Sequence, residues 1–505
     1  MTVRFDPASP ERFRDFIARD FGLSFDDAKL AFLGDVLKRR AETLAKPVEV
    51  YLAELEAGSA PPGEVGALAE ELTVGETYFF RNGDQFRAFR EIVLPERMQA
   101  RAASARLRFL SAGCSSGEEA FSLAIIAREA VPSPPWQVSI RAVDVNPAAL
   151  RKAAGGRFTN WALRDTPPAV QQKWFTPQGR DLMLSDDIRA GVQFDQRNLM
   201  DAASDVWVED AYDAVFCRNV VMYFSPAIQQ EVIGRIACSL VPGGYLFLGH
   251  AETLRGLSQE FHLVHTHDTF YYRRKAEGDE APPLYLRGDN VRRLAPAAPL
   301  PPAVVDTGWY AAIGRATERI EALSRTPDPV VPPLVAKPAW SLGLALDLLQ
   351  RERFAEALDL IRAMPAEAGV DPDVLLLQAT LLVHGGKLAA AAEVCRVLLA
   401  GDEMNAGANY VLALCFEGVG DRTAATHHYR VASYLDPNFA MPRLHLGLLA
   451  RRGGEMATAK EDLTQALDLL RREDASRLLL FGGGFTRDAL IALCEAELKR
   501  CGARA

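Results

Sequence analysis

The sequence predicts two kinds of structure in one chain: an α/β Rossmann-like sheet in the first half and an all-α superhelix near the end. The first prediction rests on three apolar segments, 107–112, 138–143 and 212–217, each followed by polar or glycine residues. The second rests on alanines that recur every 34 residues from Ala345 onward. A chain of 505 residues is long enough for about three domains.

A glycine turn after the first predicted strand indicates a ligand pocket. Gly113 and Gly117 allow the backbone to pass close to a ligand, and Glu118 and Glu119 open the following helix. Two carboxylates would repel phosphate, but they suit a cationic ligand with ribose and amino groups. S-adenosylmethionine (SAM) has these features. An ordinary tight strand-to-helix turn is the alternative reading of this motif.

The next two strands carry polar residues at the same predicted edge of the sheet. The second ends at Asp144, where a carboxylate can accept from both ribose hydroxyls. The third is followed by Arg218 and Asn219, and then by Tyr223. Ligands of open α/β sheets bind at this edge, so the spacing fits a nucleoside pocket.

Six motifs together resemble one known family. They are ETYFFR, GCSSGEEAFSLA, AVDVNPAAL, FDQRNLM, DAVFCRNVVMYF and GYLFLGHAETL, in this order along the chain. Over roughly residues 10–274 the chain is similar to the CheR-type chemotaxis receptor methyltransferases, which are SAM-dependent protein-glutamate O-methyltransferases. The resemblance implies a SAM methyltransferase sheet with an N-terminal helical domain and a small β-subdomain.

The resemblance also implies a set of SAM contacts, to which the glycine turn adds Gly113. The matching positions are Thr77, Arg81, Glu119, Asp144, Asn198, Leu199, Arg218 and Asn219. One position departs from the family, because Gly75 stands where many members have Asn. The loss of one side-chain hydrogen bond, about 0.5–1.5 kcal/mol, is expected to weaken SAM binding without abolishing it.

The chemistry of this reaction predicts few catalytic groups. A glutamate side chain has an ordinary pKa of about 4.3, so at neutral pH it can attack the methyl group without a general base or a metal. Alignment is the main task. Arg81 is the predicted catalytic residue that positions a carboxylate, because its planar fork matches two oxygens. Tyr223 is the second, as a phenolic donor near the methyl group. A surface cation and a core aromatic are the alternative readings.

Composition excludes several classes of protein. A net charge of -9 argues against nucleic acid as a partner, and no apolar stretch is long enough for direct membrane insertion. The seven cysteines form no CxxC pair, so reduced thiols and a cytoplasmic location are expected. His262, His265 and His267 lack an acidic or cysteine partner in the sequence, and no metal site is predicted.

The predicted domains follow these patterns. A helical domain at 1–72 precedes the methyltransferase domain at 73–274, whose β-subdomain spans about 155–197 with a short hairpin. A Pro/Ala-rich linker follows at 275–337. The N-terminal domain carries basic residues that either contact the receptor, as the resemblance implies, or form a solvated face: Lys29, Lys38, Arg39 and Arg40.

The last part of the chain is an internal repeat. Small residues recur at the 34-residue period of tetratricopeptide repeats, at Ala345, Ala379, Ala413 and Gly447 and again at Ala357, Ala391, Ala425 and Ala459. Four repeats are predicted at 338–475, with a capping helix in 476–505 that begins near Thr486. Such an array is expected to bind a protein or peptide, whose identity the sequence does not reveal.

The function predicted from the sequence is SAM-dependent methyl transfer to glutamate carboxylates of a methyl-accepting chemotaxis-type receptor. Two alternatives remain at this point. The chain could be a SAM-binding scaffold that acts only through its repeats, or a methyltransferase with an unrelated acceptor.

Overall fold

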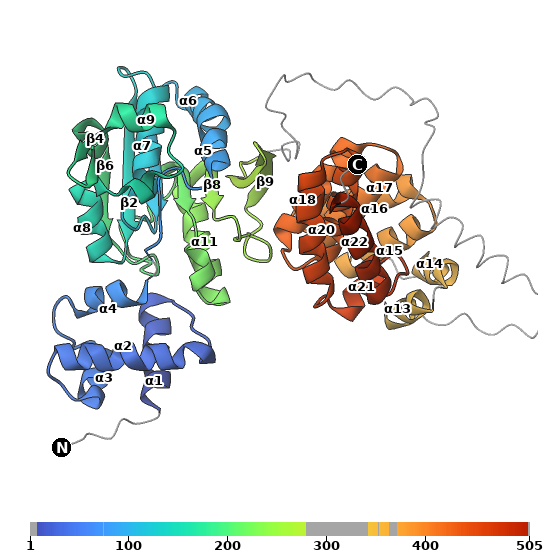
Figure 1. Ribbon diagram of the computed structural model, residues 1–505, viewed down its shortest axis with the longest axis horizontal. Helices are drawn as coiled ribbons and strands as arrows, with labels where there is room; N and C mark the ends of the chain where they lie inside the picture. Colours follow the sequence, from blue (N-terminus) through green and yellow to red (C-terminus); the bar gives the residue numbers. More distant parts are fainter. Residues whose placement is uncertain (1–7, 74, 279–341, 352, 363–370, 503–505) are drawn as a thin grey trace, which may run out of the picture. The chain divides into compact units, whose positions relative to one another are not determined.

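The computed structural model describes residues 8–73, 75–278, 342–351, 353–362 and 371–502. The chain divides into two compact units, Met1–Val291 and Arg292–Ala505 (Figure 1, blue to green and orange to red). The first contains a mixed sheet and the second is all-helical within its described residues, which confirms the predicted fold class. The predicted linker at 275–337 falls outside the described residues from position 279 onward.

A seven-stranded sheet forms the centre of the first unit. Its strands are β1 (Arg106–Ala112), β2 (Gln137–Asp144), β6 (Val192–Gln196), β7 (Tyr212–Cys217), β8 (Leu240–Leu248), β9 (Phe261–Thr266) and β10 (Thr269–Arg274). They run in the order β6-β2-β1-β7-β8-β10-β9, with β10 antiparallel to both of its neighbours and the other pairs parallel. Because β1 pairs with β2 on one side and β7 on the other, the chain reverses its winding at β1, where open sheets bind ligands.

Helices connect and cover these strands. They are α5 (Gly83–Ala88), the π-helical turn η2 (Phe89–Val93), α6 (Leu94–Ala100), α7 (Glu118–Ala130), α8 (Pro147–Gly155), the 3₁₀ turn η4 (Val221–Tyr223) and α11 (Pro226–Ser239). Aromatic rings join helix to sheet: Phe89 meets Phe109 edge-on at 5.1 Å, and Phe216 stacks on Phe247 at 4.3 Å between centroids. These fully buried side chains fix the strand ends that hold the site.

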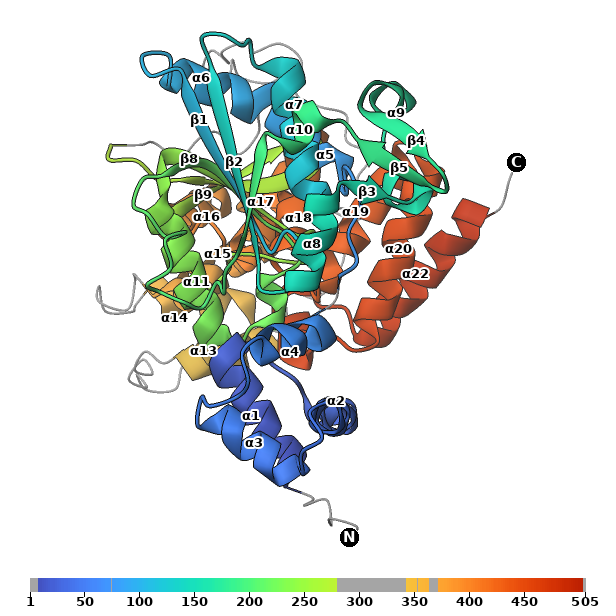
Figure 2. The same ribbon diagram turned by 90° about the vertical axis from the view of Figure 1, so that its left-hand side faces the viewer.

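A second, small sheet stands beside the main one (Figure 2). Its region comprises β3 (Arg157–Phe158), η3 (Asn160–Leu163), α9 (Pro168–Trp174), β4 (Phe175–Gln178), β5 (Asp181–Leu184) and α10 (Asp186–Arg189). Gln178 pairs with Asp181, so the hairpin is as short as its sequence predicts. The predicted subdomain range extends further than this sheet, because β6 pairs with β2 in the main sheet.

The N-terminal helices form a bundle of their own. They are α1 (Ser9–Phe21), η1 (Asp27–Lys29), α2 (Leu30–Thr43), α3 (Val48–Glu56) and α4 (Glu64–Leu72). Their apolar faces meet in a buried cluster that includes Phe13, Ile17 and Leu37.

The basic residues of α2 do not form a free cationic surface. Arg40 makes a two-pronged contact with the buried Glu64, at 2.9 and 2.6 Å, and Arg39 Nε donates to Glu71 at 2.8 Å. Two of the four basic side chains predicted to contact a receptor are therefore paired within the bundle. Arg39 and Arg40 thus face carboxylates of α4, and their contact with a receptor stays a prediction.

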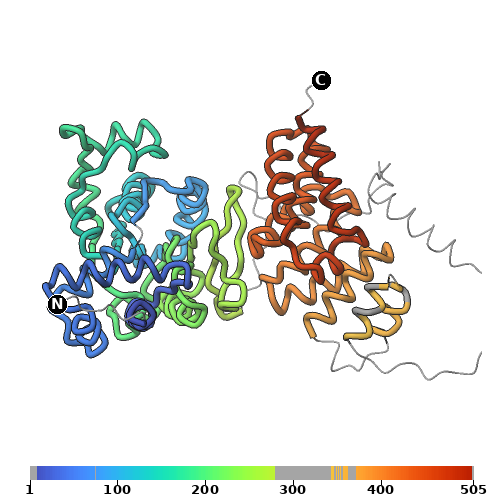
Figure 3. Tube along the Cα trace, turned by 60° about the horizontal axis from the view of Figure 1, so that its bottom comes forward, coloured from blue at the N-terminus to red at the C-terminus, as the bar shows by residue number. Residues whose placement is uncertain are grey.

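The second unit is built of helical hairpins (Figure 3). Its helices are α13 (Leu342–Gln350), α14 (Phe354–Arg362), α15 (Pro372–His384), α16 (Leu388–Gly401), α17 (Ala406–Gly418), α18 (Arg422–Leu435), α19 (Ala440–Arg452), α20 (Met456–Leu470), α21 (Ala475–Phe481) and α22 (Arg487–Gly502). The starts of α15, α17 and α19, at 372, 406 and 440, are 34 residues apart. The starts of α16, α18 and α20, at 388, 422 and 456, have the same spacing, so each hairpin occupies one sequence period.

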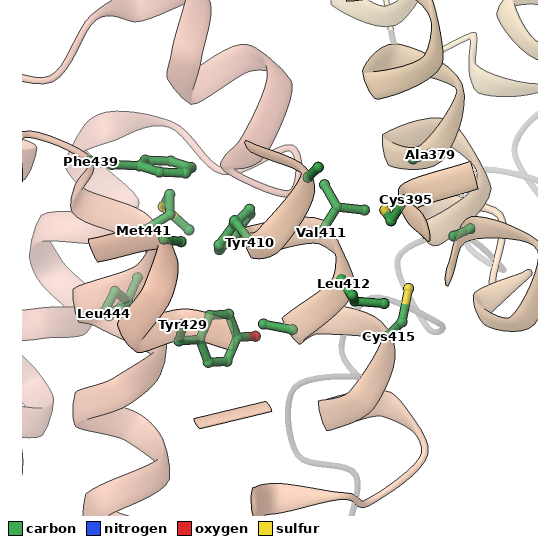
Figure 4. Packing of buried hydrophobic residues seen from close by; sticks show 14 of the residues in the cluster. Ala379, Cys395, Tyr410, Val411, Leu412, Cys415, Tyr429, Phe439, Met441 and Leu444 are labelled. Atoms are coloured by element: carbon green, nitrogen blue, oxygen red, sulfur yellow. The ribbon is translucent and has the colours of Figure 1, made fainter. Parts of the chain in front are cut away.

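Small residues let the helices of each hairpin pack closely. Ala379, which Figure 4 labels, and Ala413 are fully buried. At Gly447 a Cβ atom would lie only 2.6 Å from Cγ of Leu463 on α20. Bulky residues then fill the space between helices, as Tyr410 of α17 and Tyr429 of α18 do with ring centroids 5.8 Å apart (Figure 4). The alternation of small and large side chains predicted from the period is thus the packing scheme of this core.

A buried polar cluster crosses this core. The carboxylate of Glu417, only 5% exposed, accepts from Tyr429 Oη at 2.7 Å and from Arg452 Nη1 at 2.9 Å, and lies 3.0 Å from Nδ1 of His445. Burial raises the pKa of Glu417, but the contacts with His445 and Tyr429 outweigh it and lower the pKa to about 2. The charged carboxylate is therefore part of the folded array.

Acid is expected to loosen the array through Glu417. Because its pKa is lower folded, at about 2, than unfolded, at about 4.3, its stabilisation is present above pH ~4.3 and is lost as the pH falls towards 2. The change in the free energy of unfolding is on the order of 3 kcal/mol. Hydrogen exchange of the α17 amides between pH 5 and 2.5 measures it. Glu417→Gln should remove this pH dependence, and Glu393→Gln, at an exposed carboxylate, should keep it. A wild-type profile that matches that of Glu417→Gln would contradict the assignment.

Candidate functional site

One cavity of about 470 Å³ opens at the carboxyl edge of the main sheet. This volume lies within the roughly 300–1,000 Å³ that small-molecule sites occupy. The sheet contributes the lining residues Gly113, Ser115, Asp144, Val145, Asn146, Asn198, Leu199, Asn219, Val220 and Tyr223. The N-terminal bundle and the segment after it contribute Phe21, Leu23, Phe25, Lys29, Phe32, Leu72, Thr73 and Gly75. The cavity is therefore a joint product of the sheet and the bundle.

The glycine turn after β1 forms the floor of this cavity. Gly113 has a φ of +77°, and a Cβ atom there would lie 2.4 Å from Cγ2 of Val220. Gly117 also has a positive φ, of +91°, and touches α8 through Ala153. Only glycine satisfies both the backbone angle and the close approach at Gly113. The turn can therefore pass between two walls of the cavity without filling it.

Asp144 is fixed at the end of β2 by the backbone. Its Oδ2 accepts from the Ser115 N–H at 2.8 Å and its Oδ1 from the Asn146 N–H at 2.8 Å. Burial raises the pKa of this carboxyl, and the two backbone donors oppose that rise. The carboxylate keeps lone pairs for further donors on the cavity side. The Asp144 carboxylate lies where open α/β sheets bind the ribose of a nucleoside.

Glu119 and Arg218 form a buried ion pair behind the cavity. Glu119 Oε2 lies 3.3 Å from Arg218 Nη1, and its Oε1 accepts from Ser111 Oγ at 2.8 Å. Burial raises the pKa of Glu119 and lowers that of Arg218, and the attraction between them opposes both shifts. Arg218 Nη2 also donates to the backbone oxygen of Arg81 at 2.5 Å. The pair thus connects β1, α7 and the carboxyl end of β7 to the segment that carries Arg81.

Arg81 lies beside this pair. Its Nη1 donates to the backbone oxygen of Glu76 at 3.0 Å, and its guanidinium lies 5.7 Å from the ring centroid of Tyr78. Its charge is close enough to lower the pKa of Glu119. Neither Arg81 nor Thr77, in the same segment, lines the cavity. The predicted residues therefore divide into a set that lines the cavity and a set that does not.

Tyr223 and Asn198 connect the cavity to the N-terminal bundle. The backbone oxygen of Tyr223 accepts from the Ser24 N–H at 2.8 Å, and Asn198 Nδ2 donates to the backbone oxygen of Asp20 at 2.8 Å. The Tyr223 side chain is 40% exposed, so it is not a core aromatic. Of the predicted site residues, the cavity brings together Gly113, Asp144, Asn198, Leu199, Asn219 and Tyr223.

Glu252 is a further residue that the sequence reasoning missed. It is 5% exposed, and its two oxygens accept from four backbone N–H groups, those of Asn219, Val220, Met222 and Gly249, at 2.6–3.1 Å. This carboxylate holds the loop between Arg218 and Tyr223 in place, including the positive φ of +59° at Asn219. The signal in the sequence is an acid shortly after β8, within GHAETL.

Glu252→Gln is expected to destabilise the first unit and to weaken ligand binding at the cavity. The amide nitrogen cannot accept, so about two of the buried N–H groups lose their partner, at a cost on the order of 3 kcal/mol. Thermal unfolding and calorimetric titration measure the two effects. Glu231→Gln, at an exposed carboxylate on α11, is the matched control. Unchanged stability in Glu252→Gln would show that the loop does not depend on this carboxylate.

The thiols and histidines near the sheet have structural surroundings. Cys114 and Cys217 are buried, and burial raises the pKa of both thiols, which opposes a nucleophilic role. His262 and His265 are buried in β9, and His267 Nε2 lies 2.9 Å from Glu91. In the part of the chain that the structure describes, no three His, Cys, Asp or Glu side chains are grouped as metal ligands would be. Within the same part, no helix combines the length and apolarity needed to span a membrane.

Comparisons with known proteins match the first unit to one family. Residues 75–270 match the family described as CheR methyltransferase, SAM binding domain. The chain is 34% identical over 274 residues to chemotaxis protein methyltransferase 2 of Vibrio cholerae, covering 53% of this chain and 94% of that protein. It is 27% identical over 451 residues to the probable biofilm formation methyltransferase WspC of Pseudomonas aeruginosa, covering 89% of this chain and 96% of that protein.

One further comparison concerns solved structures. The type III secretion chaperone SycD of Yersinia enterocolitica, in complex with a peptide of the translocator YopD, is matched at 20% identity with a TM-score of 0.22, over 25% of this chain and 89% of that one.

The fold, the cavity at the strand ends and the match to a SAM-binding domain define the first unit as a methyltransferase of the SAM-dependent class. Since the Vibrio relative is matched over nearly its whole length at 34% identity, the chain belongs to the CheR-type chemotaxis protein methyltransferases.

Proposed function

We propose that the chain methylates glutamate side chains of a methyl-accepting chemotaxis-type receptor, forming glutamate methyl esters. The observation that carries this proposal is the cavity, which presents Asp144 and Tyr223 to one space at the strand ends. The name of the Vibrio relative, a chemotaxis protein methyltransferase, supports a protein of the chemotaxis system as acceptor. The two alternatives, a scaffold without transfer activity and an unrelated acceptor, have no residue of the site in their favour.

Each residue of the site would have its own role in binding SAM. Asp144 would hold the ribose of SAM, with Gly113 giving the backbone clearance beside it. Asn198, Leu199 and Asn219 would contact the nucleoside from the cavity walls. Thr77, Glu119 and Arg218 would contact SAM, as the resemblance implies, and the Glu119–Arg218 pair would also position the segment that carries Arg81.

The transfer itself would need alignment rather than proton movement. Bound SAM supplies a sulfonium methyl group. The acceptor carboxylate is already charged at neutral pH, so a C–O bond forms as the C–S bond breaks, and no proton is transferred. Holding the reacting groups in line can contribute about 7–11 kcal/mol. Arg81 would orient a carboxylate and Tyr223 would donate near the methyl group, and no metal would take part.

Labelled SAM tests this proposal directly. The chain is incubated with methyl-labelled SAM and membranes that contain chemotaxis-type receptors, and the labelled protein is then treated with base. Label on a receptor that is released as methanol is expected from glutamate methyl esters. Label that resists base, or that appears on another class of protein, would favour an unrelated acceptor. Absence of label with normal SAM binding would favour the scaffold.

The domain division leads to a separate prediction. A fragment of residues 1–275 contains the whole cavity lining and should fold alone and bind SAM with the affinity of the full chain. A fragment of residues 73–275 lacks the wall formed by Phe21, Leu23 and Phe32 and should bind more weakly, tenfold or more. Calorimetric titration compares the three proteins. An insoluble or non-binding 1–275 fragment would show that the repeats belong to the methyltransferase fold.

A further inference from the structure

The first helices of the hairpins form a surface that α21 covers. Helix α21 packs against α13 and α15, although more than 90 residues separate it from α15 along the chain. Its last residue, Phe481, meets Tyr410 of α17 edge-on at 5.5 Å between centroids and lies 5.0 Å from the ring of Phe439, just before α19. One short helix therefore touches four successive hairpins along the surface by which such arrays bind their partners.

This surface has features that match an incoming segment. Gly407 leaves space for the Phe481 ring. A Cβ atom at this position would lie 3.1 Å from Cζ of Phe481 and 2.8 Å from Leu376. Tyr410 Oη donates to the backbone oxygen of Phe481 at 3.1 Å. The contact thus combines a ring pocket with a backbone hydrogen bond.

Charge complements the apolar contact. Arg477, one turn before Phe481, pairs with Asp436 at 2.9 Å, and its guanidinium lies 5.3 Å from the centroid of Phe439. Asp436 belongs to the turn between α18 and α19 and not to the segment itself. The surface therefore recognises a basic side chain one helical turn ahead of an aromatic one.

The segment that covers the surface is too short to form a stable helix without the array. α21 has seven residues, too few for a helix to be stable alone, and Leu478 is its one buried side chain. Three glycines, Gly482–Gly484, follow it, with φ of +65° and +80° at the last two. A short helix beside a glycine hinge can leave its seat while α22 remains packed on α20.

We propose that α21 is a displaceable internal ligand that closes the partner surface of the helical array. The partner would be a short apolar helix with α21's own chemistry, a basic residue followed one turn later by Leu and Phe side chains. Binding of that partner would require α21 to swing out about the glycines. This inference concerns the second unit and does not depend on the acceptor of the methyltransferase.

A peptide with the sequence of residues 474–485, labelled with a fluorophore, tests this in the full-length chain. Phe481→Ala should bind the peptide at least tenfold more tightly than wild type, because the competing internal segment is weakened. Gly407→Leu in the Phe481→Ala background should remove that gain by filling the ring seat. Phe485→Ala, at an exposed ring in the same segment, should behave like wild type. A peptide with Ala in place of its Phe481 equivalent should not bind.

Two outcomes would overturn the proposal. One is a folded Phe481→Ala chain, checked by circular dichroism, that binds the peptide no better than wild type. The other is loss of the array's fold in Phe481→Ala, because α21 would then be a structural part and not a ligand. Hydrogen exchange of the wild-type chain gives an independent reading. The amides of α21 should exchange at least tenfold faster than those of α20 and α22, and equal rates would contradict displacement.

Discussion

Asp144→Ala is expected to lower the affinity for SAM by tenfold or much more while the chain remains folded. The carboxylate is set by the Ser115 and Asn146 N–H groups, and two charge-assisted hydrogen bonds to ribose are worth about 1.5–3 kcal/mol each. Calorimetric titration with SAM measures the loss. Asp187→Ala, at an exposed carboxylate of α10, is the control. Unchanged affinity in a folded Asp144→Ala chain would remove this residue from the site.

The protonation of Asp144 offers a second measurement. Burial raises the pKa of this carboxyl above the ordinary value, despite the opposing backbone donors. As the pH falls, SAM affinity should therefore decline at a higher pH than an exposed aspartate would dictate. Asp144→Asn keeps the size of the side chain and should flatten this dependence. A decline of the same shape in both proteins would assign it to another group.

Arg81→Ala is expected to lower the rate of methyl transfer by a hundredfold or more, and Tyr223→Phe to lower it less. Misplacement of reacting groups by about 1 Å can cost a hundredfold, and the Phe ring preserves the shape of Tyr223. The loss should appear mainly in kcat, because Arg81 would hold a carboxylate in line for the transfer. Arg87→Ala, at an exposed pair with Asp84, is the control.

The outcomes of this measurement are distinct. Near-normal turnover in Arg81→Ala would show that the residue only packs on Tyr78 and Glu76. A loss confined to SAM affinity would make it a binding residue. Metal chelators should leave the wild-type rate unchanged, and their inhibition of it would contradict direct transfer.

The parts of the fold that could be predicted are those set by local pattern. The glycine turn and the acid at the end of β2 follow from short apolar strands with polar residues after them, and the structure has these strands at Arg106–Ala112 and Gln137–Asp144. The 34-residue period places each hairpin because every repeat uses the same small residues at the same helix crossings. Thr486 caps the last helix through its Oγ1, which accepts from Ala489 at 3.3 Å, as its position before an apolar run predicts.

The parts that could not be predicted depend on contacts between distant segments. Glu252 looks like any acid in a loop until four backbone N–H groups converge on it. The pairing of Arg40 with Glu64 requires two helices that the sequence does not place side by side. The seat of Phe481 on Gly407 likewise arises only when the array is assembled. Side-chain direction has the same origin, and the role predicted for Arg81 stays a prediction, since this residue is not among those that line the cavity.

The hydrogen bonds that join the N-terminal bundle to the loop of Tyr223 bear on how such proteins can be recombined. Leu23 forms a bridge with Phe224, and Ser24 donates to the backbone of Tyr223. A chimera made by exchanging the bundle at residue 72 would carry one wall of the cavity from each parent, and its two halves would have to match residue by residue. The segment after residue 275 is free of this constraint, since the cavity takes no lining from beyond Phe224. We therefore expect that the helical array can be exchanged without changing the cavity, whereas the first 72 residues cannot.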